Sequence, residues 1–218
     1  MKVMKPGFPA FLKILSLPEK RWSAALKNYL REGGYNFYWS MQKGIRNVAT
    51  YQETEEVARN VILGLKSEHE RKHNLYGFEV FCGIRPKFRI DSFVPEMVKY
   101  ETDDANISIK IDPEFGYWRG SQKVITSFWN PAFPKLDSHS AGLGILLKQW
   151  AYDRTRLSDA EFHVYDLRSR KVYGHKDVPA FAEAVLNRKL KAIEDLWLEL
   201  NEKPKDGSSR SVQPGDRL

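Results

Sequence analysis

The sequence is nearly free of cysteine and has no long apolar run. Cys82 is the single cysteine among 218 residues, so an intrachain disulfide is excluded. No stretch reaches the roughly 18–20 apolar residues of a membrane-spanning helix, and residues 1–6 lack the continuous apolar segment of a signal peptide. These absences predict a protein of the reducing cytoplasm that has no membrane partner.

Several signatures of common enzyme classes are also missing. The sequence contains no Walker loop, dinucleotide-binding glycine fingerprint, Gly-x-Ser-x-Gly elbow or Cys-x-x-Cys pair. Gly142-Leu143-Gly144 lies within a helical pattern and does not follow a strand. It therefore indicates close helix packing rather than phosphate binding.

Charge is abundant but unevenly distributed. The chain is 42% hydrophobic and 29% charged, which is typical of a globular protein. The formal net charge of +7 arises entirely in residues 1–50, which hold nine basic and only two acidic residues. Such an excess indicates either contact with a polyanion such as DNA or simply a solvated basic surface. The candidate nucleic-acid-binding residues are Lys20, Arg21, Lys27, Arg31, Lys43 and Arg46.

Helical and strand patterns along the chain predict a single α/β domain with a central mixed sheet of about four or five strands flanked by helices. We expect a basic, helical segment over residues 1–50, an α/β core over residues 51–203 and a disordered tail over residues 204–218. Within the first segment, residues 1–15 are expected to form an irregular arm.

The central stretch of the core is predicted as a hairpin. Residues 107–111 alternate apolar and polar side chains, Arg119-Gly120-Ser121 is a glycine-containing turn, and residues 123–129 are rich in β-branched and aromatic side chains. Before it, residues 50–72 are predicted as one helix, residues 77–82 as a strand carrying Glu79, and residues 95–106 as a loop or short helix. After it we expect a helix over residues 138–156, strands over residues 161–167 and 171–173, and a long helix capped by Asp177.

One literal motif occurs at the end of the predicted helix of residues 50–72. His69-Glu70-Arg71-Lys72-His73 matches His-Glu-x-x-His, in which two imidazoles four residues apart hold zinc and the Glu polarises a water molecule. The flanking residues are charged, whereas a catalytic zinc helix is normally buried. A zinc hydrolase and a solvated helix end both remain open.

The order of elements resembles the PD-(D/E)XK nuclease superfamily, and its RecB-like branch in particular. The resemblance covers residues 67–175: helix, strand with Glu79, strand ending in Ile111-Asp112-Pro113, hairpin, proline-containing loop, helix and strand pair. It implies a restriction-endonuclease-like fold, DNA as partner, Mg²⁺ as cofactor, and a phage or mobile-element context. The chemistry of that family needs carboxylates that converge on Mg²⁺ and a Lys that polarises the attacking water.

Position by position, the match is incomplete. Asp112 fits the first acid, but the acid of the acid-x-Lys pair falls at Ser127 and its Lys at Trp129. In place of a Gln-x-x-x-Tyr motif, the following helix offers Lys148, Gln149 and Tyr152. Ser127 and Trp129 are therefore degenerate positions.

Several functions follow from these departures. The preferred hypothesis is a nucleic-acid-associated protein with an inactive or strongly altered site that binds DNA or a protein partner in DNA processing. In an active Mg²⁺-dependent nuclease, Asp112 with Glu79 or Glu114 would hold the metal, and Lys148 or Lys123 would supply the positive charge. We take Asp112, Glu79 and Lys148 as the catalytic set, with Asp112 and Glu79 as metal ligands. Asp112-Pro113-Glu114 is also compatible with an ordinary exposed turn. A third hypothesis is a protein-interaction module that uses the sheet only as a scaffold.

Overall fold

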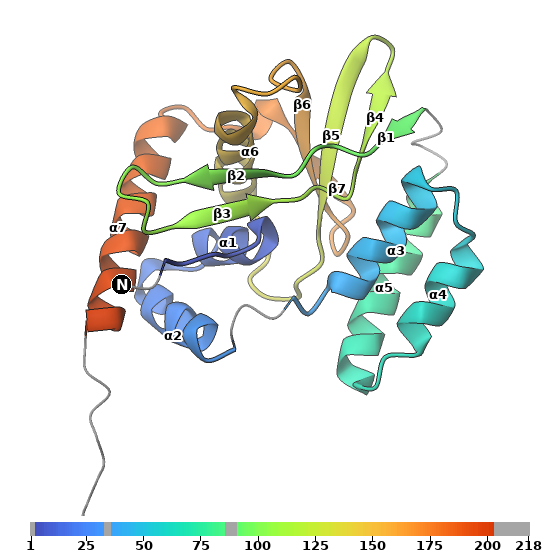
Figure 1. Ribbon diagram of the computed structural model, residues 1–218, viewed down its shortest axis with the longest axis horizontal. Coiled ribbons are helices and arrows are strands. Elements are labelled where there is room, and N and C mark those ends of the chain that lie inside the picture. The colour runs from blue at the N-terminus through green and yellow to red at the C-terminus, as the bar shows by residue number, and fades with distance from the viewer. Residues whose placement is uncertain (1–2, 33–35, 86–90, 203–218) are drawn as a thin grey trace, which may run out of the picture.

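The computed structural model describes residues 3–32, 36–85 and 91–202, and these form an α/β structure with a central mixed sheet (Figure 1). The sheet has five strands in the order β1-β4-β5-β6-β7, and a separate two-stranded sheet pairs β2 with β3. The fold class predicted from the sequence is therefore confirmed. The strands are β1 (Ser92–Phe93), β2 (Val98–Glu101), β3 (Ser108–Ile111), β4 (Phe115–Arg119), β5 (Gln122–Trp129), β6 (Glu161–Asp166) and β7 (Lys171–Tyr173).

Helices lie on both sides of this sheet. In Figure 1, α3, α4 and α5 form one group, and α1, α2, α6 and α7 form the other. The helices are α1 (Phe8–Leu15), α2 (Trp22–Glu32), α3 (Trp39–Thr50), α4 (Glu55–Leu63), α5 (Glu68–Ile84), α6 (Ser138–Tyr152) and α7 (Ala182–Glu202), with 3-10 turns η1 (Glu19–Arg21) and η3 (His175–Asp177).

The hairpin and the crossover after it form the centre of the fold. β4 and β5 are antiparallel and meet at a tight turn, where Arg119 pairs with Gln122 and Gly120 has a φ of 63°. That positive φ is favourable only for glycine and similarly small or polar residues. After β5 the chain passes through α6 and returns as β6, which pairs with β5 in parallel, as a helical crossover allows.

The first strand of the hairpin differs from the prediction. Residues 108–111 form β3, which pairs with β2 rather than with β5, and the hairpin strand is β4. Residues 98–101, predicted as loop or short helix, are thus a strand. Lys99 and Lys110 alternate with half-buried or buried neighbours along this ribbon, so both strands carry a short period-2 pattern.

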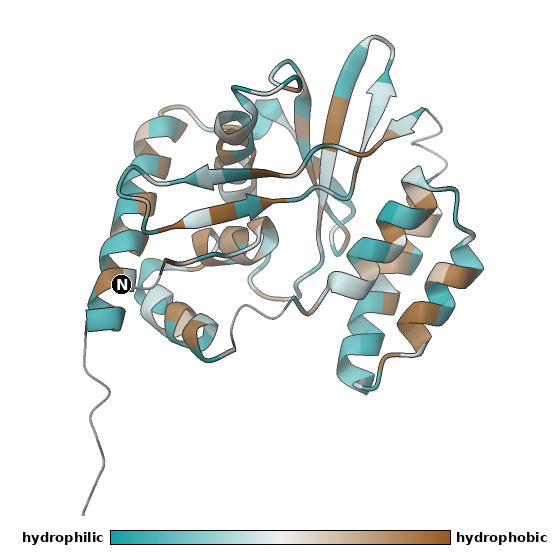
Figure 2. Ribbon diagram, viewed as in Figure 1, coloured by the Kyte–Doolittle hydropathy of each residue, from teal (hydrophilic) through white to brown (hydrophobic). Residues whose placement is uncertain are grey.

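The alternating side chains of β5 serve two separate cores. Ile125 and Trp129 belong to the cluster formed with α1, α6 and α7. Val124 and Phe128 belong to the cluster formed with α3, α4 and α5. The five-stranded sheet is therefore covered on both faces. Figure 2 shows the apolar character of α1 and of much of β3.

The region before the sheet contains two errors of prediction. The helix expected over residues 50–72 is divided, because α4 ends before its C-cap Gly64 and α5 begins after its N-cap Ser67, whose hydroxyl accepts from the Glu70 N–H. The strand expected over residues 77–82 lies inside α5. Phe78 and Phe81 are buried three residues apart, as in a helix, and their apolar spacing only resembled strand alternation.

Two further helices were not predicted. Residues 8–15, expected in an irregular arm, form α1, whose proline lies in the first turn, where no N–H is needed. Residues 39–50 form α3, which packs on α4 and α5. The expected disordered tail lies outside the described residues.

Candidate functional site

The residues at the degenerate nuclease positions lie on the buried face of β5. Lys148 on α6 donates a hydrogen bond from Nζ to Ser127 Oγ at 2.7 Å and another to the His163 carbonyl at 3.1 Å. Asp137 caps α6 by accepting from the Ser140 N–H, which fixes the start of the helix. Lys148 and Ser127 are both buried, and the Lys148 ammonium lies 4.6 Å from the centroid of the Phe8 ring on α1.

Glu114 supplies the negative charge of the same cluster. It lies next to β4, is only 2% exposed, and accepts a hydrogen bond from the Phe128 N–H at 3.2 Å. Burial raises the pKa of Glu114, while hydrogen bonds from its own and the Phe128 backbone and the charges of Lys148 and Arg46 lower it. Burial lowers the pKa of Lys148, and Glu114 opposes that shift. Each group thus stabilises the charged form of the other, and we describe Glu114, Ser127 and Lys148 as the internal charge cluster.

Asp112, the predicted first acid, is held beside this cluster by basic side chains. Its Oδ1 lies 2.6 Å from Arg46 Nη2 and its Oδ2 lies 3.3 Å from Lys110 Nζ. Arg46 also donates to the Pro113 carbonyl at 2.8 Å and, from Nε, to the Glu114 carbonyl at 3.3 Å. Arg46 on α3 therefore fastens the whole Asp112–Glu114 turn, and its charge is offset by Asp112.

Trp129 occupies the position at which the resemblance expects lysine. Its side chain is 1% exposed and lies in the core with α1, α6 and α7. Its indole N–H has no hydrogen-bond partner within the part of the chain that the structure describes. A lysine ammonium at this depth would need a partner that the surrounding apolar side chains do not supply.

Glu79 does not share a partner with Asp112. It lies on α5 rather than on a strand, and Arg59 of α4 binds both of its oxygens, Nε to Oε1 at 2.6 Å and Nη2 to Oε2 at 3.2 Å. Among residues 3–32, 36–85 and 91–202, no group of three or more His, Cys, Asp or Glu side chains is placed to hold a metal. The carboxylates of Asp112 and Glu79 are bound by separate basic side chains, and that of Glu114 accepts from the Phe128 N–H, so the three carboxylates do not converge on one point as magnesium ligands would.

The two histidines of the His-Glu-x-x-His motif pack against each other on α5. The rings of His69 and His73 lie edge to face with centroids 4.6 Å apart, and the Phe37 ring contacts both. One ring nitrogen of His73, Nδ1, lies 2.7 Å from Arg168 Nη2. Burial and the neighbouring Arg168, His69 and Lys72 lower the pKa of His73. The motif thus makes aromatic and hydrogen-bonding contacts here.

The predicted nucleic-acid-binding residues lie mostly on exposed surfaces. Lys20 and Arg21 lie in η1, Lys27 and Arg31 on α2, and Lys43 on α3, and all five are exposed. Arg46 differs, because it is bound to Asp112.

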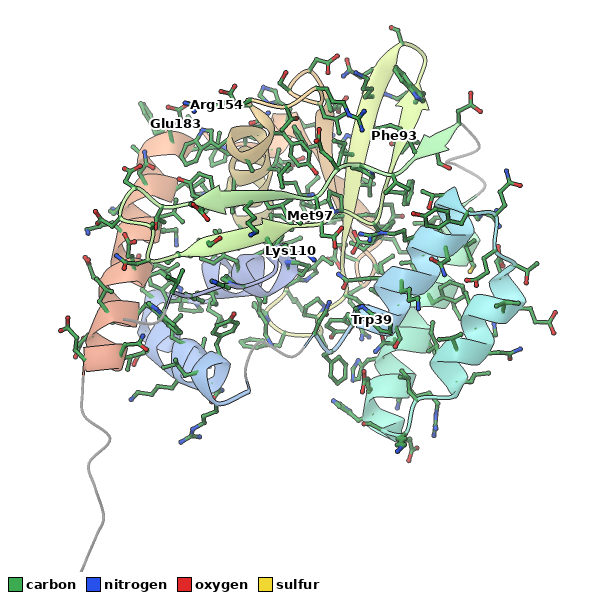
Figure 3. All side chains as sticks on the ribbon, viewed as in Figure 1. Trp39, Phe93, Met97, Lys110, Arg154 and Glu183 are labelled. Carbon is green, nitrogen blue, oxygen red and sulfur yellow. The ribbon has the colours of Figure 1, made fainter. Side chains whose placement is uncertain are left out.

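Two of these cations lie over exposed rings. Lys43 Nζ is 4.9 Å from the centroid of the Trp39 ring, which is 54% exposed, and Arg21 is 5.2 Å from that of Phe133. Figure 3 labels Trp39 at the start of α3. Lys43 and Arg21 form no ion pair within the described residues, so both remain available to an anion.

Sequence reasoning identified some of these residues and not others. Glu114 was only the alternative to Glu79 as second acid, but it is Glu114 and not Glu79 whose charge acts on Lys148. The role of Arg46 as the anchor of Asp112 was missed, because no local pattern links residues 66 positions apart. The contact between Arg168 and His73 was missed for the same reason.

Comparison with known proteins adds little to this geometry. No protein-family model matches the chain, and no curated protein is significantly similar to it in sequence. Among solved structures, one described as "Crystal structure of SSO0001" has 11% sequence identity and a TM-score of 0.35, over 82% of this chain and 85% of the other. No described helix is both long and apolar enough to cross a membrane.

Proposed function

We propose that this protein binds nucleic acid and that it does so on a PD-(D/E)XK nuclease-like fold whose site has lost catalysis. The internal charge cluster is the observation that carries the proposal. Lys148 Nζ bonds Ser127 Oγ at 2.7 Å, at the place where the family pattern puts a metal-binding acid. Burial lowers the pKa of Lys148 to about 7, and the charge of Glu114 opposes that shift. A lysine bound to a serine thus replaces the carboxylate that the family pattern places there.

The arrangement of the sheet supports the nuclease-like part of the proposal. The family pattern has a hairpin whose return strand is followed by a proline-containing loop, a helix and a strand pair. β4, β5, α6 and β6 follow that order, with β4 and β5 antiparallel and β5 and β6 parallel. Trp129 in the core and Ser127 bound to Lys148 leave no acid-x-Lys pair on β5.

The distribution of charge supports nucleic acid as the partner. The net charge of +7 comes from the first fifty residues, and their exposed members in η1, α2 and α3 include cations over exposed rings. Such cations bind phosphates non-specifically and release counterions when they do so.

The proposal is tested by following one labelled DNA in two ways. Fluorescence anisotropy measures binding of a 20-bp duplex, and a denaturing gel of the same samples with Mg²⁺ or Mn²⁺ measures cleavage. We expect binding that weakens as salt is added, and intact DNA. Absence of low-salt binding of both this duplex and a 20-nucleotide single strand would overturn the proposed partner.

An active nuclease is the second candidate, and the proximity of Glu114 and Lys148 favours it. Both are buried, so a substrate could reach them only if the elements that cover them moved away, among them α1, whose Phe8 lies against Lys148. Metal-dependent cleavage that disappears in Glu114→Gln would establish this candidate and overturn the loss of catalysis. Cleavage that persists equally in Glu114→Gln and Lys148→Met would indicate a contaminating nuclease, and the protein would then be repurified before scoring.

A further inference from the structure

The outer side of α5 carries a connected row of rings and cations that the proposed function does not yet use. His69, His73 and Tyr76 lie on this helix, and Arg168 reaches them from the turn between β6 and β7. We call His69, His73, Tyr76 and Arg168, with the flanking Lys72 and Arg170, the α5 ring row.

Direct contacts join the four flat groups of the α5 ring row. His69 and His73 are 4.6 Å apart between ring centroids, His73 Nδ1 is 2.7 Å from Arg168 Nη2, and the Arg168 guanidinium lies 4.2 Å from the Tyr76 ring centroid. Arg168 Nε also donates to the Asn130 carbonyl at 3.0 Å, which fixes the guanidinium. The flat groups are therefore held in place before any ligand arrives.

The row is accessible and positively charged. Tyr76 is 40% exposed, and beyond it lies a shallow hollow lined in part by Lys72, Arg170 and Glu79. Glu79 is bound on both oxygens by Arg59, so its charge is offset. No carboxylate forms an ion pair with Lys72, Arg168 or Arg170 in residues 3–32, 36–85 and 91–202.

We infer that the α5 ring row binds single-stranded nucleic acid. Unpaired bases expose both faces and stack on aromatic rings and on guanidinium planes, whereas the bases of a duplex are already stacked. Tyr76 and Arg168 offer such planes, and Lys72 and Arg170 lie where they would meet the backbone phosphates. The inference rests on the proposed nucleic-acid binding and adds to it a contact surface and a preference for single strands.

The preference for single strands is tested with the full-length chain. Fluorescence anisotropy gives the Kd for a labelled 20-nucleotide oligothymidylate and for a 20-bp duplex in the same buffer. We expect the single strand to bind at least fivefold more tightly. A duplex that binds as well or better overturns the inference and leaves the proposed function standing, whereas no salt-sensitive binding of either DNA overturns both.

The surface itself is tested by removing one ring. Tyr76→Leu should raise the Kd for oligothymidylate about five- to tenfold through lost stacking, and Tyr76→Phe should restore most of the affinity. Tyr51→Leu is the matched control, because Tyr51 is 63% exposed at the end of α3, and its Kd should stay within twofold. Equal losses in Tyr76→Leu and Tyr51→Leu, or displacement of the DNA by polyglutamate of equal charge as readily as by unlabelled oligothymidylate, would overturn the assignment.

Discussion

At the scale of single residues, Lys148 and Glu114 are the pair on which the account depends most. Burial shifts the pKa of each group toward its neutral form, and the charge of the other group opposes that shift. Ser127, the His163 carbonyl and the Phe128 N–H supply their hydrogen bonds. Removing only one partner leaves the other buried without compensation. Loss of one partner should therefore reduce the free energy of unfolding much more than it would in a solvent-exposed pair.

Lys148→Met should destabilise the protein, and more at high pH than at low pH. Burial raises the pKa of Glu114, and loss of Lys148 raises it further. Because the folded state then holds the proton more tightly than the unfolded state, stability is retained below the unfolded pKa of Glu114 and declines as the pH rises toward the folded value. We expect a loss of roughly 3–5 kcal/mol at pH 8 and a clearly smaller loss at pH 5.

Urea unfolding at the two pH values measures this difference. The double variant Glu114→Gln/Lys148→Met should recover much of the stability lost at pH 8, since no buried charge remains. A loss in Lys148→Met that is the same at pH 5 and pH 8 would contradict the internal charge cluster.

At the scale of elements, close packing of α6 depends on its glycines. A Cβ at Gly142 would lie 2.1 Å from the Asp177 carbonyl oxygen, which belongs to the backbone of η3. The sequence predicted close helix packing for this glycine, and the contact confirms it. The opposite case is Gly83 in α5, where a Cβ would meet no atom within 4 Å.

Gly142→Ala and Gly83→Ala are therefore expected to act in opposite directions. Gly142→Ala must shift α6 or η3 and should cost about 1–3 kcal/mol, as overpacking of a core does. Gly83→Ala should be neutral or stabilising by up to about 1 kcal/mol, because alanine is the better helix former. Thermal or urea unfolding measures the stability of both variants. A Gly142→Ala variant as stable as the parent would show that the packing of α6 against η3 is looser than described.

The elements also show where sequence reasoning succeeds. β5, β6 and α6 were predicted because the spacing of apolar residues within each segment is enough to indicate a strand or a helix. The β4–β5 turn was predicted because it contains Gly120. α5 was misread because Phe78 and Phe81 are three apart and Val80 lies between them, so that both periods fitted a short window. The pairing of β3 with β2 could not be predicted from the sequence, because the partner of a strand depends on how all the strands pack together.

The same limit applies to the candidate site. Asp112 and Ser127 were chosen because each lies at a position that the family pattern defines, and Lys148 because it lies on the helix that follows. Their partners Arg46, His163 and Phe8 were not, because tertiary contacts and not local patterns bring them there. The depth of Glu114 likewise depends on the packing of α3 and β4 around it.

At the scale of the whole molecule, the basic residues of the first fifty positions differ in whether a carboxylate of the protein already pairs with them. Lys43 and Arg46 lie three residues apart on α3, yet Lys43 lies over an exposed ring and Arg46 is bound to Asp112. Only a cation that is not already paired should release counterions when DNA binds. These two residues therefore form a matched pair.

Lys43→Gln should lower the slope of log K against log salt by about 0.7–0.9, the value for one phosphate contact. Arg46→Gln should leave the slope almost unchanged and instead reduce stability by about 1.5–3 kcal/mol, because hydrogen bonds to a charged group are lost. Anisotropy titrations and urea unfolding measure the two effects. A slope lowered equally by both variants would show that Arg46 contacts the DNA.

The most direct test of nucleic-acid binding is a salt titration of the unaltered protein with labelled DNA and Mg²⁺. We predict a linear fall of log K with log salt, with a slope of about −3 or steeper if four or more phosphates are contacted, and DNA that remains uncut throughout. Binding that does not change with salt, or no binding at low salt, would contradict the account.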